Sequence, residues 1–337
     1  MLKGPSTLII SPICGSNKAV EDFNSEAKAF DVWRQNVRNP YVREHRNVFV
    51  NRLGQVWRPD GKIIRDCGRQ LPVASREAAA FARRIPVAGL AISAHAGNFY
   101  HWMVDLLPSL SWRTSEEAEG IPLVIGSDAA GFVRESLALI GCGSSCLEEV
   151  DDAVFVERLD EGEATGARIQ PDGAHKPLLE RLRMEADSAG IPGNKSAEWI
   201  YISRRDSPLR SMSNEEELEE AVTKIGFKVL RFSSHNLLEQ SVAIRHARFV
   251  LGPHGAGFSH IIFSRPDTHF FEVTPYEAGS ANQRYCMARM SRIMGNQHTI
   301  WLESVASASG SWAASIEPLI AKVSENIHRD SKESDVF

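Results

Sequence analysis

The feature that most constrains the fold is a regular alternation of short apolar runs and helical segments between residues 199 and 273. The apolar runs predict four buried strands, at Trp199–Ser203, Phe227–Phe232, Ala247–Leu251 and His269–Val273. The segments between them predict helices at Asn214–Ile225, at Leu237–Arg245 and from a glycine-rich turn through Phe263. Such an alternation is typical of a doubly wound sheet of parallel strands.

Helix-capping residues support these helix positions. Ser213 directly precedes the first helix, and Glu216 lies three residues after Ser213, which is the pattern of a capping box. The second helix has two candidate N-caps, Ser234 and Asn236. The helix starts are therefore signalled independently of the apolar pattern.

The first half of the chain alternates in the same way, with less regular spacing. Residues 48–57 predict a β-hairpin around Gly54, and strands and helices follow as far as residue 189. A length of 337 residues is more than one hydrophobic core usually fills. With a linker at 190–196, we expect an N-terminal domain over 1–195, a C-terminal domain over 196–310, and a helix with a polar tail over 311–337.

Composition excludes several classes of protein. The formal net charge of −5 argues against a nucleic-acid binder that relies on a basic surface. No apolar stretch reaches the ~20 residues that a membrane span needs, so we expect a cytoplasmic protein; peripheral association with a membrane stays open. The five cysteines are irregularly spaced, which argues against a disulfide framework, and Cys142 and Cys146 are interpreted as structural or incidental.

The glycine-rich turn follows the third of the four strands. Its residues are Gly252, Pro253, His254, Gly255, Ala256 and Gly257. Glycines let the backbone approach a ligand closely, and the N–H groups of a following helix favour a phosphate. The order of the glycines differs from the Gly-x-Gly-x-x-Gly of dinucleotide-binding loops. From spacing alone, a tight turn packed for shape is an equal alternative.

Two arginines, Arg204 and Arg205, follow the first strand, and Arg210 lies shortly after them. Because the carboxyl ends of parallel strands meet at one edge of a sheet, these side chains are expected near the glycine turn. A planar guanidinium suits bidentate contact with phosphate. A solvated basic surface is the alternative.

Two further features carry carboxylates. Glu272 lies in an apolar strand, where a carboxylate needs a partner; ribose hydroxyls and an internal salt bridge are equal alternatives. His101 and Asp105 are four residues apart, so they share a helix face and can form a general base. A hydrogen bond without any chemistry is the alternative for this pair.

No Asp-x-Asp sequence occurs in the chain. Paired carboxylates are what enzymes use to hold a nucleotide diphosphate through Mg²⁺ or Mn²⁺. We therefore expect no metal site and no cofactor, with arginines and a helix N-terminus in place of the metal.

Taken together, these motifs resemble those of glycosyltransferase family 61. The resemblance covers roughly residues 90–275 and rests on four ordered motifs: Asn98–Pro108, Tyr201–Arg205 with Arg210 and Asn214, Gly252–Gly257, and Phe271–Val273. The family has plant and animal members and many bacterial proteins of capsular polysaccharide synthesis, and the chain is most similar in character to the bacterial type. Members usually carry Asn at the position of His260 and Leu at that of Phe258, which bears on donor identity more than on donor binding.

The resemblance implies a GT-B type α/β fold with two Rossmann-like domains facing a central cleft, the N-terminal one binding the acceptor and the C-terminal one a nucleotide sugar. It implies an inverting, metal-independent glycosyltransferase that moves a sugar from a nucleotide-diphosphate donor, UDP-sugar first, to a hydroxyl of a glycan or polysaccharide precursor. The residues carried over are Asp105 as general base with His101, and Arg204, Arg205, Arg210, Asn214, Gly252, His254, Gly255, Ala256, Gly257 and Glu272 for the donor, with Glu272 on the ribose.

Two other classes remain as alternatives. A non-catalytic sugar-nucleotide or polysaccharide-binding protein would keep Arg204, Arg205 and the glycine turn without needing Asp105. A dehydrogenase is disfavoured by the glycine order. The sequence names neither the sugar, the acceptor nor the oligomeric state.

Overall fold

The computed structural model describes residues 8–12, 17–67, 82–93, 95–166, 168–189, 198–207, 211–304 and 312–334. The chain divides into two compact units, residues 1–37 with 186–337 and residues 38–185. The predicted linker at 190–196 lies outside the described residues, as does Arg210.

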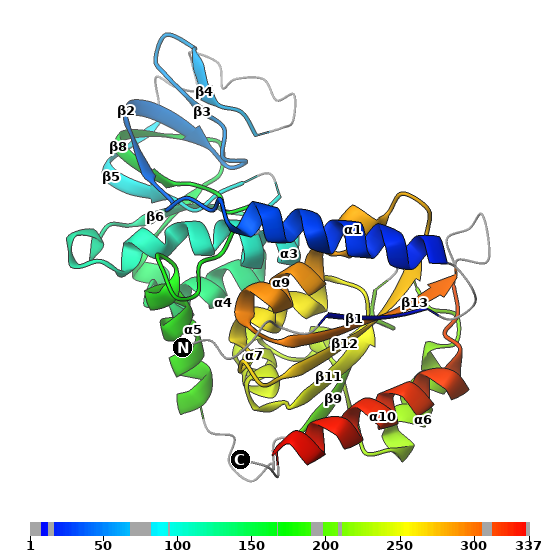
Figure 1. Ribbon diagram of the computed structural model, residues 1–337. Helices are drawn as coiled ribbons and strands as arrows, with labels where there is room; N and C mark the ends of the chain where they lie inside the picture. The colour runs from blue at the N-terminus through cyan, green and yellow to red at the C-terminus, as the bar shows by residue number, and fades with distance from the viewer. Residues whose placement is uncertain are drawn as a thin grey trace. The chain divides into compact units, whose positions relative to one another are not determined.

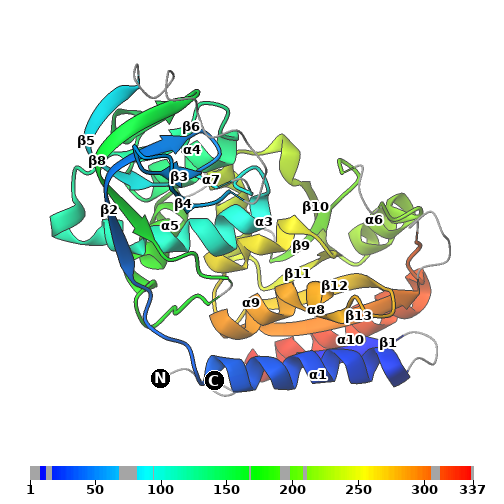
Figure 2. The same ribbon diagram turned by 90° about the horizontal axis from the view of Figure 1, so that it is seen from above.

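The first unit is built on a six-stranded sheet with the order β1-β13-β12-β11-β9-β10 (Figure 2). Every neighbouring pair is parallel. The strands are β1 (Leu8–Pro12), β9 (Trp199–Ser203), β10 (Lys228–Arg231), β11 (Phe249–Pro253), β12 (His269–Tyr276) and β13 (Gln297–Ser304). The four strands expected between residues 199 and 273 are thus confirmed, together with their parallel direction.

Helices cover both faces of this sheet. α6 (Glu215–Lys224) and α10 (Ile316–Ser334) lie on one face, and α1 (Asn17–Arg34), α8 (Ala281–Arg284) and α9 (Cys286–Met294) lie on the other (Figure 1). α7 (Leu237–His246) and the 3-10 helices η5 (Phe232–Ser234) and η6 (Ala256–Phe263) complete the unit. The α6–α10 face forms a core in which Leu218, Leu319 and Val323 are 0% exposed. Burial of this kind contributes roughly 1.5–3 kcal/mol for each large apolar side chain.

The helix caps agree with the sequence in one of two cases. Asn236 caps α7 with a complete capping box that includes Glu239. The predicted capping box of α6 is wrong, because Asn214 is the N-cap and its side chain makes no capping hydrogen bond. The Ser213 hydroxyl instead donates to the Trp312 carbonyl, which holds the chain that leads into α10.

The N-terminal residues belong to this first unit, although we expected them in an N-terminal domain over 1–195. β1 pairs with β13 at the edge of the sheet, and α1 packs beside α8. Phe23 is fully buried against the rings of Tyr276 and Tyr285, 6.1 and 6.4 Å away between centroids. The Tyr276 hydroxyl also donates to Asp22 at 2.5 Å.

The second unit has a seven-stranded mixed sheet with the order β4-β3-β2-β8-β5-β6-β7. Its strands are β2 (Val42–Asn51), β3 (Val56–Trp57), β4 (Ile63–Arg65), β5 (Arg83–Leu90), β6 (Leu123–Gly126), β7 (Leu147–Val150) and β8 (Ala153–Gly162). The strands β8, β5, β6 and β7 run parallel, whereas β4, β3, β2 and β8 pair antiparallel. The α/β class is confirmed, but this sheet is Rossmann-like only in its parallel part.

The hairpin predicted at residues 48–57 is the origin of the antiparallel part. Phe49 pairs with Trp57 across it, and Gly54 takes a φ of +77° in its turn. A Cβ at position 54 would also lie 2.6 Å from the Ile92 carbonyl oxygen, so glycine is required there.

The remaining elements of this unit are short apart from two helices. They are α3 (Phe99–His101), η1 (Trp102–Leu106), η2 (Pro108–Thr114), η3 (Glu116–Ala118), α4 (Gly131–Leu139), η4 (Ser144–Cys146) and α5 (Lys176–Ser188), which runs across the boundary between the units. Cys142 and Cys146 form a disulfide beside α4, a pairing that we did not expect from the sequence. Within the described part of the chain, no helix is long and apolar enough to cross a membrane.

Candidate functional site

The glycine turn lies at the carboxyl end of β11, in the first unit. The pairing with β12 continues through His254, whose N–H donates to the Val273 carbonyl at 2.8 Å, and the helix η6 begins at Ala256. Ala256 and Gly257 are partly exposed, whereas the residues before and after them are buried. The accessible part of the turn is therefore the amino end of a helix, where backbone N–H groups favour an anion.

Glycine is required at the three glycine positions of the turn for different structural reasons. A Cβ on Gly252 would lie 2.8 Å from the Ile202 carbonyl oxygen, and one on Gly257 would lie 3.1 Å from Ile202 Cγ2. These two glycines let the turn pack against β9, so the packing interpretation holds for them. A Cβ on Gly255 would lie 2.0 Å from a guanidinium nitrogen of Arg204, so this glycine leaves room for the arginine.

Arg204 lies directly against the turn. Its guanidinium donates to the His254 carbonyl and, at 3.1 Å, to the Ser207 hydroxyl. Its backbone N–H donates at 2.6 Å to Glu215, which also accepts from the Tyr201 hydroxyl. The pairing of Arg204 with the glycine turn therefore places a fixed positive charge next to the helix end.

Arg205 lies in a different environment. Its guanidinium forms ion pairs with Glu216 at 3.2 Å and with Glu219 at 3.4 Å. Glu219 is shared with Arg231, also at 3.2 Å, and accepts from the Ser203 hydroxyl. The two arginines that adjoin in sequence are thus separated by the structure, since only Arg204 contacts the turn.

Asn214 uses both ends of its side chain on backbone. Its amide nitrogen donates to the Ala314 carbonyl and its oxygen accepts from the Ala314 N–H, each at 2.9 Å. This bidentate contact fastens the segment before α10. Asn214 therefore has a structural role here, whereas the family motif implies contact with the donor.

Glu272 is the centre of a buried polar chain. Its carboxylate is 0% exposed and accepts from His254 at 2.5 Å and from His298 at 3.1 Å. The other ring nitrogen of His298 lies 2.8 Å from the Ser291 hydroxyl. Burial by itself raises the pKa of Glu272, but His254 and His298 outweigh it and lower the pKa to about 2. The carboxylate is fully buried and each of its oxygens contacts a histidine, which is the salt-bridge alternative rather than a hold on ribose.

His260 is buried beneath the glycine turn and contacts its backbone at Gly257. Its ring is 1% exposed, with Nδ1 2.8 Å from the Gly257 carbonyl and Nε2 2.7 Å from the Gln240 amide oxygen. It also contacts the Phe232 ring edge-on at 4.6 Å between centroids. Burial lowers the pKa of His260 to about 4, and the hydrogen bond to Gly257 offsets this only in part.

The buried His260 predicts an acid-sensitive first unit. Because its folded pKa lies below the unfolded value of 6.5, its stabilising effect is complete above pH 6.5 and is lost as pH falls toward 4. We expect the free energy of unfolding to fall by about 2 kcal/mol from this ring between pH 7 and pH 5. Urea titrations at the two pH values measure it, and His260→Asn should show a shallower dependence. An unchanged dependence in the variant would contradict this assignment.

His101 and Asp105 lie together in the second unit, as expected. His101 Nδ1 is 2.9 Å from Asp105 Oδ2, and Asn98 caps the segment by accepting from the N–H groups of Tyr100 and His101. The segment is a helix as predicted, but residues 102–106 form a π-helix, a form that is frequent at functional sites. The His101 side chain is 44% exposed and that of Asp105 is 22% exposed, so the imidazole is the more accessible group.

A pocket in the second unit is lined in part by the loop that precedes this pair. It occupies about 660 Å³, including space open to solvent, and lies at the carboxyl ends of β5 and β6. Its lining includes Ser93, Ala96 and Gly97 from the loop before His101, and Gly126 at the end of β6. Ligands of α/β sheets bind at this edge.

Sequence reasoning missed two histidines of these sites. The ring of His95 is exposed and lies 5.5 Å from that of His101. His298 completes the contacts of Glu272 from β13. Neither residue lies in a recognisable motif. For His298 the sequence signal was its position as a polar residue inside the apolar run of β13.

The segment that holds these motifs is similar to known proteins. A family model described as Glycosyltransferase 61 matches residues 99–271, just over half of the chain. A beta-1,2-xylosyltransferase of Oryza sativa subsp. japonica is 36% identical over 161 residues, which is 44% of this chain. The match covers 30% of the rice protein, so the chain matches less than a third of that relative's length. The enzyme class expected from the motifs is confirmed at the level of the family: the chain belongs to the glycosyltransferase 61 family.

Proposed function

We propose that this chain transfers a sugar from a nucleotide-diphosphate donor, with UDP as the nucleotide, to a hydroxyl of a glycan or polysaccharide precursor. The observation that carries the proposal is the glycine turn, where Arg204 and the partly exposed start of η6 lie together at the carboxyl edge of a parallel sheet. A guanidinium and helix N–H groups stabilise the charge that develops on a departing diphosphate. The family membership supports the sugar as the group transferred.

Within this proposal the roles of the donor residues differ from those expected. Arg204 and the amides of Ala256 and Gly257 contact the diphosphate. Glu272 holds His254 rather than the ribose, because its carboxylate is fully buried and contacts two histidines. Arg205 and Asn214 support the fold around α6.

The catalytic pair also changes roles in the proposal. Because Asp105 contacts Nδ1 of His101, the carboxylate fixes the tautomer in which Nε2 lacks a proton. His101 Nε2 then takes the proton of the acceptor hydroxyl as its oxygen bonds to the anomeric carbon. The bond from that carbon to the diphosphate breaks at the same time, and its electron pair leaves with UDP. A single displacement of this kind inverts the anomeric centre.

The pocket at the ends of β5 and β6 is the proposed acceptor site, since it adjoins the segment of His95 and His101. Donor and acceptor are then held by different units, as in a GT-B enzyme. No step of this mechanism requires a metal ion, because Arg204 and the helix end supply the positive charge.

The test is release of UDP from a panel of UDP-sugars, with and without EDTA. UDP-xylose is the first member of the panel, because the rice relative is a xylosyltransferase. We expect slow hydrolysis of at least one UDP-sugar, at a rate that EDTA does not change. A thermal shift with a UDP-sugar but no release of UDP would instead identify a non-catalytic binding protein.

A further inference from the structure

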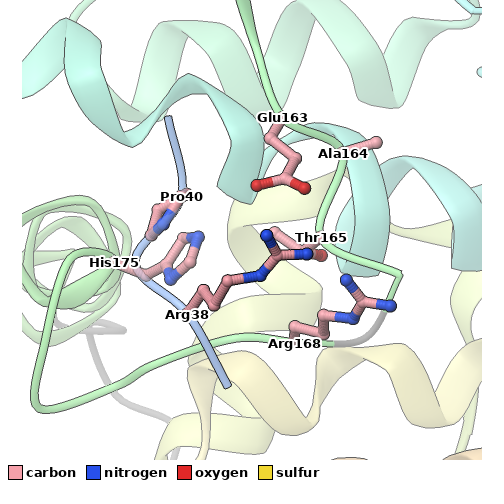
Figure 3. A pocket seen from close by; sticks show the side chains of 7 residues that line it. All are labelled: Arg38, Pro40, Glu163, Ala164, Thr165, Arg168 and His175. Atoms are coloured by element: carbon pink, nitrogen blue, oxygen red, sulfur yellow. The ribbon is translucent and has the colours of Figure 1, made fainter. Parts of the chain in front are cut away.

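A second, smaller pocket in the second unit has no role in the mechanism described so far. It lies between the segment before β2 and the segment after β8, and its volume is about 310 Å³ including open space. Its lining comprises Arg38, Pro40, Glu163, Ala164, Thr165, Arg168 and His175. Figure 3 shows the Glu163 carboxylate pointing toward the guanidinium of Arg38, with Arg168 on one side and the His175 ring on the other.

His175 lines this pocket and carries a buried donor that has no acceptor among the described residues. The residue is 1% exposed, and its Nδ1 accepts from the Gln170 N–H at 3.0 Å. The proton of the neutral ring must then be on Nε2, which is buried and has no hydrogen-bond partner among the described residues. A buried donor without an acceptor costs about 1–3 kcal/mol, so such an atom points to a ligand that supplies the acceptor.

The charges around the pocket select the type of acceptor. Burial lowers the pKa of His175 to about 4, so its ring is a neutral donor near pH 7. Arg38 and Arg168 bring two positive charges and Glu163 one negative charge, which leaves one net positive charge. A singly charged anion balances it, and among sugars the carboxylate of an acidic sugar carries such a charge.

The pocket is connected to the segment of the catalytic pair. Thr165, which is buried in the lining, donates from its backbone N–H to the Asp105 carbonyl at 3.1 Å. Its hydroxyl donates to the Val104 carbonyl at 2.6 Å. A ligand held against Thr165 would thus touch a residue that is hydrogen-bonded to the backbone of Val104 and Asp105.

We propose that this pocket binds the carboxylate of an acidic sugar residue of the glycan acceptor, through Arg38, Arg168 and Nε2 of His175. The carboxylate supplies the acceptor that Nε2 lacks, and the guanidinium groups bind it through charge-assisted hydrogen bonds. Glu163 accepts from a hydroxyl of the same sugar. The identification of the ligand as part of an acceptor rests on the proposed function, whereas the carboxylate site does not.

The test is calorimetric titration of the whole chain with sodium glucuronate, glucose and inorganic phosphate. We expect saturable binding of glucuronate only, with affinity reduced about tenfold or more in Arg168→Gln. Arg58→Gln is the matched control, because it removes one exposed arginine of the same unit outside the pocket. NMR of labelled histidine should show the His175 Nε2–H signal shifting with glucuronate, which keeps the test open if a His175 variant does not fold.

Each other result overturns the proposal. Stronger binding of phosphate than of glucuronate would make this a phosphate site, and equal affinities in Arg168→Gln and the wild type would remove the pocket from binding. An unmoved His175 signal in saturating glucuronate would leave water as its partner. Because UDP release from a UDP-sugar is measured separately, glucuronate binding without UDP release would show that the proposed function fails while the carboxylate site stands.

Discussion

Replacement of His101 by glycine is expected to lower the rate of sugar transfer by about three orders of magnitude while the second unit stays folded. A positioned general base contributes roughly 10²–10⁴ to a rate, and the His101 side chain is accessible and oriented by Asp105. The partly exposed position makes the substitution tolerable for the fold. Steady-state rates of transfer or of UDP release, with circular dichroism of the variant, measure both effects.

Chemical rescue separates the two assignments of the base. If His101 is the base, added imidazole should restore part of the activity of His101→Gly, and Asp105→Asn should retain some activity. His328→Ala is the control, because it removes an exposed histidine of α10 in the other unit. Full activity in His101→Gly would remove it from the mechanism. Loss of activity in Asp105→Asn together with near-normal activity in His101→Gln would return the role of base to Asp105.

The largest expected loss of stability follows from Glu272→Gln. The substitution keeps the size of the side chain but leaves His254 and His298 without the carboxylate that both contact in a fully buried site. Breaking a buried charged network costs about 3–5 kcal/mol. For a unit of this size we expect the melting temperature to fall by roughly 6–20 °C.

Glu303→Gln is the matched control for this prediction. Glu303 is a buried carboxylate of the neighbouring strand β13, and it accepts from Trp301 and Ser315 rather than from histidines. It should therefore lose much less stability than Glu272→Gln. Equal losses in the two variants, or none in Glu272→Gln, would mean that the histidine contacts do not hold the turn.

The parallel sheet of the first unit could be predicted because its signals are local. Each strand from β9 to β12 is a short apolar run with a helix between it and the next, and Asn236 caps α7 with a residue three positions away. The membership of residues 1–37 could not be predicted. Each residue of β1 pairs with a residue of β13 that lies 290 positions later, and no local pattern encodes such a pairing.

The site was predictable as a set of segments and less so as a set of contacts. The strand ends identified the right edge of the sheet, and Arg204 does lie against the turn there. The direction of each side chain was not available, and adjacent residues point to different partners, so Arg205 contacts Glu216 and Glu219 instead. Glu272 was recognised as a carboxylate in need of a partner, but its partner His298 comes from a separate strand.

The most direct test of the account is calorimetric titration of UDP into the wild type and into Arg204→Gln, both in EDTA. The adjoining Arg205→Gln is the control, because Arg205 is paired with glutamates away from the turn. The account predicts that UDP binds the wild type and Arg205→Gln with similar affinity. It predicts that Arg204→Gln binds at least about tenfold more weakly, since a charge-assisted hydrogen bond contributes roughly 1.5–3 kcal/mol. Equal affinities for UDP in Arg204→Gln and the wild type, or no binding of UDP to the wild type without metal, would contradict a metal-free diphosphate site at the glycine turn.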